Sequence, residues 1–251
     1  MTPFLAWGAG APLICLHGIG GAAELWAATA AALPGHRVLA WHQPGYGGTP
    51  LPPGLSFPLL ADMLAEQLTA EGIDSADFVG HSMGGMIALE LAIRHPARIR
   101  TLLPYATTPA FGGKDPAFAQ DFLTKRLAPL DAGKTMAECA GGLVRGMCAP
   151  GADPAAEPAA IAAMAAVPEA TYRATLACLT TFDRRAALSG IAHRTRAIAG
   201  AEDQVAPART MQRMIEAMPD ASLTLIPGAG HLPHLEQPAA FHATLRSLLQ
   251  D

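Results

Sequence analysis

A serine between two glycines is the strongest candidate nucleophile in this sequence. Gly80, Ser82 and Gly84 form a G-x-S-x-G pattern that follows a short apolar run and precedes a helical pattern. A serine on a tight strand-to-helix turn projects its hydroxyl above the sheet edge, and the glycines avoid a collision as the chain reverses. An ordinary glycine-rich turn is the alternative, but the strand and helix on either side favour a nucleophile elbow.

A second glycine-rich segment could supply hydrogen bonds to a tetrahedral oxyanion. The run His17-Gly18-Ile19-Gly20-Gly21 directly follows an apolar segment. Such a loop can turn a backbone N–H toward the serine, and the residue after the nucleophile supplies a second N–H at a positive helix terminus. We therefore expect Ile19 and Met83 to form the oxyanion hole, although a simple connecting turn would also explain the glycines.

Two neighbouring carboxylates lie in the segment Gly200–Pro207, which follows a predicted strand. A carboxylate that accepts an imidazole N–H holds the ring in the tautomer that a general base needs. The pattern and the position favour Asp203 for this role, and Glu202 is the alternative. Alternatively, the acidic residues before Pro207 could have no catalytic role and simply mark the N-terminus of a helix.

Two histidines follow the last predicted strand, on and after the glycine-rich segment Pro227–Gly230. His231 is the expected general base, and His234 is expected to pack or to make a local hydrogen bond. The order Ser82, Asp203 and His231 along the chain is typical of α/β-hydrolases and differs from that of chymotrypsin-like and subtilisin-like enzymes.

With these motifs, the chain resembles the α/β-hydrolase superfamily over nearly its whole length, and within it the 3-oxoadipate enol-lactonases. Residues 40–49 (AWHQPGYGGT) are similar to the family's D-x-P-G-x-G-x-S loop, and residues 181–188 and 227–241 resemble enol-lactonase segments. The resemblance implies hydrolysis of a small ester or enol-lactone through an acyl-enzyme, with no metal or organic cofactor. C–C bond hydrolases of ring-cleavage products, perhydrolases and acyltransferases of the same fold remain alternatives.

Substrate contacts are harder to assign from the sequence. His42 stands where the family has an aspartate, so it is either a structural residue or a substrate contact at the mouth of the cleft. The arginines Arg126, Arg145 and Arg173 could each pair with a substrate carboxylate or lie on a solvated helix face. Arg145 is the most unusual of them, because apolar residues surround it in the sequence.

The elements that must position these residues follow from hydrophobic patterning. Over residues 11–107 and 194–250, short apolar runs alternate with helical patterns, which is typical of βα units on a parallel sheet. The expected strands are 12–16, 37–41, 76–80, 98–103, 196–199 and 222–226, and the expected helices are 23–32, 58–71, 83–94, 207–218 and 238–249.

Strand signals vanish in the middle of the chain, where prolines interrupt several helical patterns. We therefore predict an α/β-hydrolase fold, with a mostly parallel sheet and helices on both faces. Its core spans 1–107 and 184–251, and 108–183 form a helical cap insertion. The family normally has two strands before the His-Gly loop, and the few residues before Pro12 predict a truncated sheet edge or a single strand there.

Composition excludes several classes of protein. The 251 residues are 51% hydrophobic and only 15% charged, which excludes intrinsic disorder. The net charge is −4 and the basic residues form no cluster, so we expect neither a nucleic acid nor an anionic membrane as a partner. The four cysteines form no CxxC pair or metal-ligand spacing, and the first residues do not look like a signal peptide. We expect a cytoplasmic monomer or homodimer that acts on a small molecule.

Overall fold

A seven-stranded sheet forms the centre of the protein in the computed structural model, which describes residues 2–112 and 116–250. The strand order is β1-β3-β2-β4-β5-β6-β7, and every neighbouring pair is parallel except β1 with β3. The strands are β1 (Phe4–Trp7), β2 (Ala11–Leu16), β3 (His36–Trp41), β4 (Ala76–His81), β5 (Ile99–Tyr105), β6 (Arg194–Gly200) and β7 (Ala221–Ile226).

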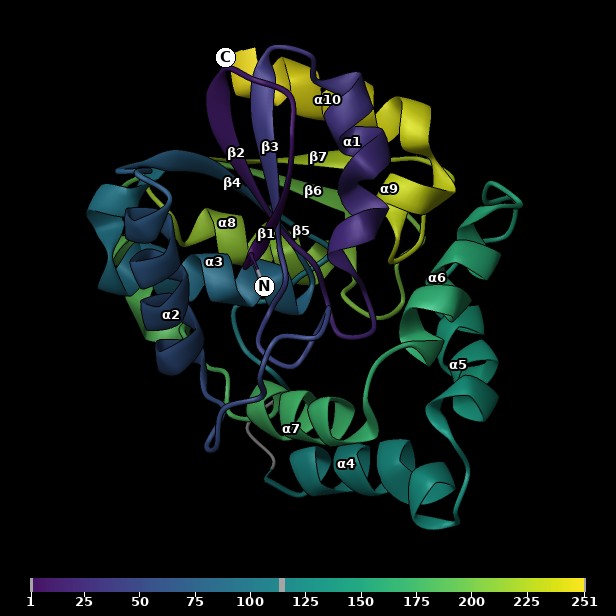
Figure 1. Ribbon diagram of the computed structural model, residues 1–251. Coiled ribbons are helices and arrows are strands. Elements are labelled where there is room, and N and C mark those ends of the chain that lie inside the picture. Colours follow the sequence, from purple (N-terminus) through teal and green to yellow (C-terminus); the bar gives the residue numbers. More distant parts are fainter. Residues whose placement is uncertain (1, 113–115, 251) are drawn as a thin grey trace.

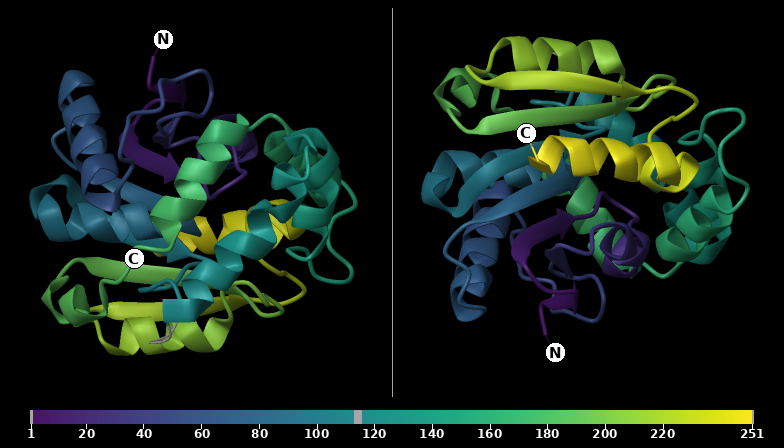
Figure 2. Two further views of the ribbon diagram at one scale, coloured as in Figure 1. Left: turned by 90° about the horizontal axis from the view of Figure 1, so that it is seen from below. Right: turned by 90° about the horizontal axis from the view of Figure 1, so that it is seen from above.

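Helices cover both faces of this sheet (Figures 1 and 2). One face packs against α2 (Phe57–Ala70), α3 (Met83–Arg94) and α8 (Ala208–Glu216), and the other against α1 (Ala27–Ala32) and α10 (Pro238–Gln250). Shorter helical turns are η1 (Ala23–Trp26), η2 (Pro96–Arg98), η3 (Arg185–Gly190) and α9 (Pro233–Glu236). Among the described residues, none of the helices combines the length and the hydropathy needed to cross a bilayer.

Alternation along the strands explains the two-sided core. Ile14 and Leu16 of β2 belong to the cluster under α2 and α3, whereas Leu13 and Cys15 belong to the cluster under α10. Successive side chains of a strand point to opposite faces, so a strand that is apolar throughout must be covered on both sides. The buried sheet therefore leaves the loops at the ends of its strands as the place for chemistry.

In the described part of the chain between β5 and β6, four α-helices lie beyond one end of the sheet (Figure 1). They are α4 (Pro116–Asp131), α5 (Met136–Arg145), α6 (Ala156–Ala165) and α7 (Glu169–Leu179). A capping box between Thr135 and Glu138 begins α5. A third apolar cluster joins these helices to Tyr46 and Leu232 of the core loops, so they pack onto the rest of the protein as well as onto one another.

The predicted fold class is confirmed, including the reduced sheet edge. Among the described residues, β1 is the one strand that precedes β2, and it pairs antiparallel with β3. Details of the helices differ from the expectation. The pattern over 23–32 divides into the η1 turn and α1, and Pro207 is the N-cap of α8, not its first residue. The short helix α9, which begins at a proline, was not predicted.

Candidate active site

Ser82 lies on the tight turn that joins β4 to α3. Its backbone has φ 50° and ψ −115°, a left-handed conformation that is costly for a residue with a side chain and recurs at functional sites. The Ser82 amide donates to the Tyr105 carbonyl at 2.9 Å, and the Ser82 carbonyl accepts from the Thr107 hydroxyl at 2.7 Å. The end of β5 therefore holds this strained turn in place.

Glycines allow the turn to be this tight. A β-carbon on Gly80 would lie 2.6 Å from the carbonyl oxygen of Gly84, and one on Gly84 would collide with the carbonyl oxygen of Leu16. Helix α3 thus starts in direct backbone contact with β4 and β2. This packing explains why the flanking residues of the motif must be glycines.

The three side chains predicted to act together meet at the carboxyl ends of β4, β6 and β7. The imidazole of His231 donates from Nδ1 to Asp203 Oδ2 at 2.9 Å, and its Nε2 lies 3.1 Å from the Ser82 hydroxyl oxygen. Because a carboxylate only accepts, it fixes the proton on Nδ1 and leaves Nε2 free to accept from the serine. His231 and Asp203 are both buried.

Asp203 is held as an anion by its surroundings. Burial raises its pKa, but the hydrogen bond and charge of His231 and the amides of Ala206 and Val205 outweigh burial, so the pKa lies below its usual value. The two amides donate to Oδ1 at 2.9 and 2.7 Å, respectively. Asp203 is therefore ionised at neutral pH and can orient the imidazole.

The two alternative residues lie elsewhere. Glu202 is exposed, and its carboxylate accepts from the Gly228 amide at 3.3 Å. His234 stacks on Trp26, with ring centroids 5.7 Å apart and an interplanar angle of 20°. Burial and the nearby charges of His242 and His231 lower the pKa of His234 to about 3. The structure brings Asp203 and His231 to Ser82, and it gives Glu202 and His234 other contacts.

The residues expected to supply oxyanion donors also lie beside Ser82. Met83 is the first residue of α3, where the amides have no acceptor within the helix. Ile19 lines the same pocket as Ser82. A β-carbon on Gly18 would lie 3.0 Å from the Ser82 β-carbon, so the His-Gly loop passes directly over the serine.

Two buried polar residues that support this arrangement were not predicted from the sequence. Glu236 accepts hydrogen bonds from the amides of Gly230 and Leu232, at 2.8 and 2.7 Å, on either side of His231. Gln43 donates to the carbonyl of His17 at the start of the His-Gly loop. Glu236 lies inside the segment that resembles enol-lactonases, but only the folded loop shows what its carboxylate binds.

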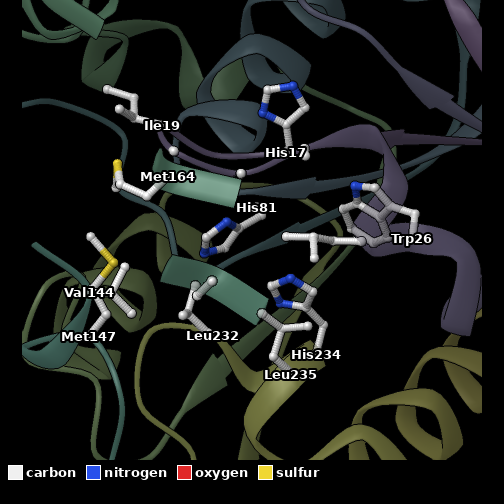
Figure 3. Close-up of a pocket in the computed structure, with 15 residues that line it drawn as sticks. His17, Ile19, Trp26, His81, Val144, Met147, Met164, Leu232, His234 and Leu235 are labelled. Atoms are coloured by element: carbon white, nitrogen blue, oxygen red, sulfur yellow. The ribbon is translucent and has the colours of Figure 1, made fainter. Parts of the chain in front are cut away.

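A further histidine, His81, lies directly behind the serine. Its Nε2 donates to the carbonyl of His231 at 2.9 Å. Burial and the charges of His231 and His234 lower its pKa well below the ordinary value, so the ring is neutral. Figure 3 shows the His81 ring at the centre of a small cavity, with Trp26 and His234 on one side and Met164 on the other.

A pocket of about 360 Å³ opens in front of Ser82 and His231. Neither of the substrate contacts expected from the sequence lines it. His42 is buried beneath Gly47, where a β-carbon would collide with its ring. Arg145 is exposed in the last turn of α5, and its Nε donates to the Gly141 carbonyl at 3.3 Å. The arginine that does line the pocket is Arg126 of α4.

Arg173, the third arginine weighed from the sequence, is used elsewhere. It pairs with Asp131 and Glu169 at 2.7 and 2.8 Å.

Over residues 2–112 and 116–250, no three histidine, cysteine or acidic side chains gather as metal ligands would.

Comparison with known families gives one match over most of the chain. Residues 13–244 match the Alpha/beta hydrolase family. A relative from Variovorax paradoxus that is named as a carbamate hydrolase, RutD, is 29% identical over 96% of this chain and 92% of that protein. The 2-hydroxymuconate semialdehyde hydrolase of Pseudomonas sp. (strain CF600) is 29% identical over 97% and 88% of the two chains.

Esterases and lactonases are also among the similar proteins. The pimeloyl-[acyl-carrier protein] methyl ester esterase of Aromatoleum aromaticum is 31% identical over 90% of this chain and 93% of that protein. The solved enol-lactonase of Burkholderia xenovorans LB400 has a TM-score of 0.88 at 21% identity, covering 99% of this chain and 96% of that one. At that identity the likeness to the lactonase concerns the fold.

Proposed function

Because the chain belongs to the alpha/beta hydrolase family, we propose that it is a serine hydrolase of small carboxylic esters or lactones, acting through an acyl-enzyme on Ser82. The observation that carries this proposal is the position of His231, 3.1 Å from the Ser82 hydroxyl and 2.9 Å from the Asp203 carboxylate. A nucleophile within reach of a base, which a third group orients, is the arrangement that nucleophilic acyl transfer requires.

The first half of the reaction forms the acyl-enzyme. Ser82 Oγ attacks the carbonyl carbon while Nε2 of His231 takes the hydroxyl proton, and Asp203 stabilises the imidazolium that results. The negative charge that develops on the carbonyl oxygen is stabilised by the N–H groups of Ile19 and Met83. The carbon–oxygen bond to the leaving group then breaks, and His231 returns the proton to that oxygen.

The second half repeats this chemistry with water. Nε2 of His231 takes a proton from water, whose oxygen attacks the acyl carbon, and the bond to Ser82 breaks as its oxygen regains a proton. An enol-lactone suits the first step especially well, because an enolate leaves more easily than an ordinary alkoxide.

We further propose that residues 108–183 act as a cap that shapes the substrate pocket. The wall opposite Ser82 comes from this stretch, including Phe122 of α4 and Tyr172 of α7. Core residues supply the reacting groups under this proposal, and the cap selects the substrate.

Covalent labelling tests the proposal directly. A fluorophosphonate should modify the protein once per chain at Ser82, and Ser82→Ala should lose both the labelling and the hydrolysis of p-nitrophenyl esters. A wild-type protein that neither reacts with the probe nor hydrolyses any ester or lactone of the panel would refute the proposed function.

A C–C bond hydrolase is the second candidate, favoured by the 29% identity to the 2-hydroxymuconate semialdehyde hydrolase. A panel of p-nitrophenyl esters, an enol-lactone and a vinylogous diketone separates the two reactions by their relative kcat/KM. Addition of hydrogen peroxide or an acceptor alcohol to the ester assay tests the perhydrolase and acyltransferase alternatives through their products. Preference for the diketone would replace ester hydrolysis as the assigned activity.

A further inference from the structure

The pocket in front of Ser82 combines an apolar lining with a single permanent charge. Among the described residues that line it, most are aliphatic or aromatic, and Arg126 is the only one with a permanent charge. The neighbouring His81 is neutral, and Asp203 lies behind His231 and not in the lining. The guanidinium therefore gives the lining a positive charge that favours an anion.

Arg126 has no acidic partner within the described residues, which distinguishes it from most arginines around it. Arg173 of α7 forms two ion pairs, and Arg184 pairs with Glu90. Arg126 instead lies with its Cζ 5.6 Å from the ring centroid of Phe122. The Tyr172 hydroxyl also interacts with this guanidinium through its charge and a hydrogen bond. The remaining N–H groups of the half-buried fork are available for an anion.

The surroundings of Arg126 strengthen its attraction for anions. Arg126 and Tyr172 also line an adjoining groove, which carries the exposed side chains of Lys125 and Lys134. The one carboxylate of that groove, Glu138, accepts from the amide and hydroxyl of Thr135 at 2.8 Å. Three cations thus line the groove, one of them shared with the pocket, and together they favour negative charge there.

We propose that Arg126 binds a carboxylate of the substrate at the end of the pocket away from the scissile bond, so that the enzyme prefers esters or lactones that carry a second, ionised carboxyl group. A carboxylate matches the planar donor edge of the guanidinium and can accept two of its hydrogen bonds. A doubly charged phosphate would lose more hydration energy on entering this apolar pocket. The inference rests on the proposed function for the identity of the reacting end.

The test uses pairs of substrates that differ in one charge. The methyl hydrogen esters of the dicarboxylic acids from glutaric to suberic acid are compared with their dimethyl esters, and hydrolysis is followed by titration of the released acid. Wild-type protein should show the higher kcat/KM on at least one charged ester. Arg126→Gln should lower that value roughly 10- to 100-fold and change the dimethyl ester less than about twofold.

Arg145→Gln is the matched control, because it removes the same charge from an exposed cap arginine that does not line the pocket. The control should behave as wild type on both esters. The rate of Ser82 labelling by a neutral fluorophosphonate should be equal in all three proteins, which shows that the variants keep the reacting groups intact. An equal loss on charged and neutral esters in Arg126→Gln would overturn the proposal, as would a wild-type preference for phosphate or ammonium analogues.

A binding measurement separates failure of this inference from failure of the proposed function. Methyl hydrogen suberate is titrated calorimetrically into Ser82→Ala, with and without Arg126→Gln. Binding that weakens at least tenfold with the second substitution supports the carboxylate site even if wild-type protein hydrolyses no ester. Hydrolysis of neutral esters together with unchanged binding in the double variant supports the hydrolase and refutes the carboxylate site.

Discussion

The Oε2 atom of Glu236 lies 2.6 Å from the backbone nitrogen of Ala149. The same carboxylate accepts the amides of Gly230 and Leu232, so one buried side chain joins the loop of His231 to the segment that follows α5. The amide of His231 itself donates to the carbonyl of Met147 at 2.7 Å. The position of His231, the proposed general base, is therefore set partly by residues between α5 and α6.

Replacement of Glu236 by alanine should destabilise the protein strongly. It would leave three buried amides without their acceptor, and each unsatisfied donor costs about 1–3 kcal/mol. We expect the free energy of unfolding in urea to fall by roughly 3 kcal/mol or more. The exposed neighbour Glu202→Gln is the control and should change it by less than about 0.5 kcal/mol. Equal stability of Glu236→Ala and wild type would show that the three hydrogen bonds contribute little.

Substitution of Asp203 should affect the rate more than the fold. The Asp203 carboxylate accepts hydrogen bonds both from Nδ1 of His231 and from the loop amides, and the single amide oxygen of Asp203→Asn cannot do both. The imidazole of His231 then loses the tautomer that carries its proton on Nδ1. As in established Ser-His-Asp enzymes, kcat should fall by roughly 10⁴-fold. The measurement is ester hydrolysis beside Glu202→Gln, which should retain nearly full activity; the opposite ranking of the two variants would move the acidic role to Glu202.

Buried imidazoles should make the protein sensitive to acid. Burial lowers the pKa of His17 to about 4 and, together with His242 and His231, lowers that of His234 to about 3. An unfolded histidine titrates near 6.5, so between these values the unfolded chain binds more protons. Stability should therefore decrease as pH falls from about 6.5 toward 4, with a slope of about 1.4 kcal/mol per pH unit for each group.

Urea unfolding at a series of pH values checks this slope. His234→Phe keeps an aromatic ring beside Trp26 and removes one titrating group, so its stability curve should be flatter between pH 6.5 and 4. His36→Gln, at the start of β3 and half-exposed, serves as the control. Parallel curves for His234→Phe and wild type would contradict the prediction.

Close approach of the His-Gly loop to the serine predicts a steric effect at Gly18. A β-carbon there would lie 2.7 Å from Nδ1 of His81 and 3.0 Å from the β-carbon of Ser82. Gly18→Ala should lower stability by about 1–3 kcal/mol and slow fluorophosphonate labelling of Ser82. Gly35→Ala, where an added β-carbon meets nothing within 4 Å, should leave labelling unchanged. Unaltered labelling in Gly18→Ala would show that the loop can move away without consequence.

The sequence was informative where function depends on local turns after strands. Ser82, Asp203 and His231 each follow an apolar strand, and parallel strands bring their carboxyl ends to one edge, so local motifs were enough to place them together. Residues of the proposed cap were not predictable in this way. Arg145 has apolar neighbours in sequence, yet Val144 fills the interior and Arg145 faces solvent.

Long-range contacts account for the other difference. Arg126 reaches the pocket because α4 packs beside α7, and Glu236 matters because the segment after α5 returns to the loop of His231. Neither contact leaves a periodic signal in the sequence. His42, for which the sequence left a structural role open, is buried with its ring against the backbone of Gly47 in its own loop.

The bond from His231 to Met147 also constrains how the protein can open. A swing of helices α4 to α7 as one rigid body would pull His231 out of line with Ser82, because the stretch after α5 is bonded to the loop of His231. A shift of α4 and α7, the pair that carries Arg126 and lies on the other side of the insertion (Figure 1), would leave that bond intact.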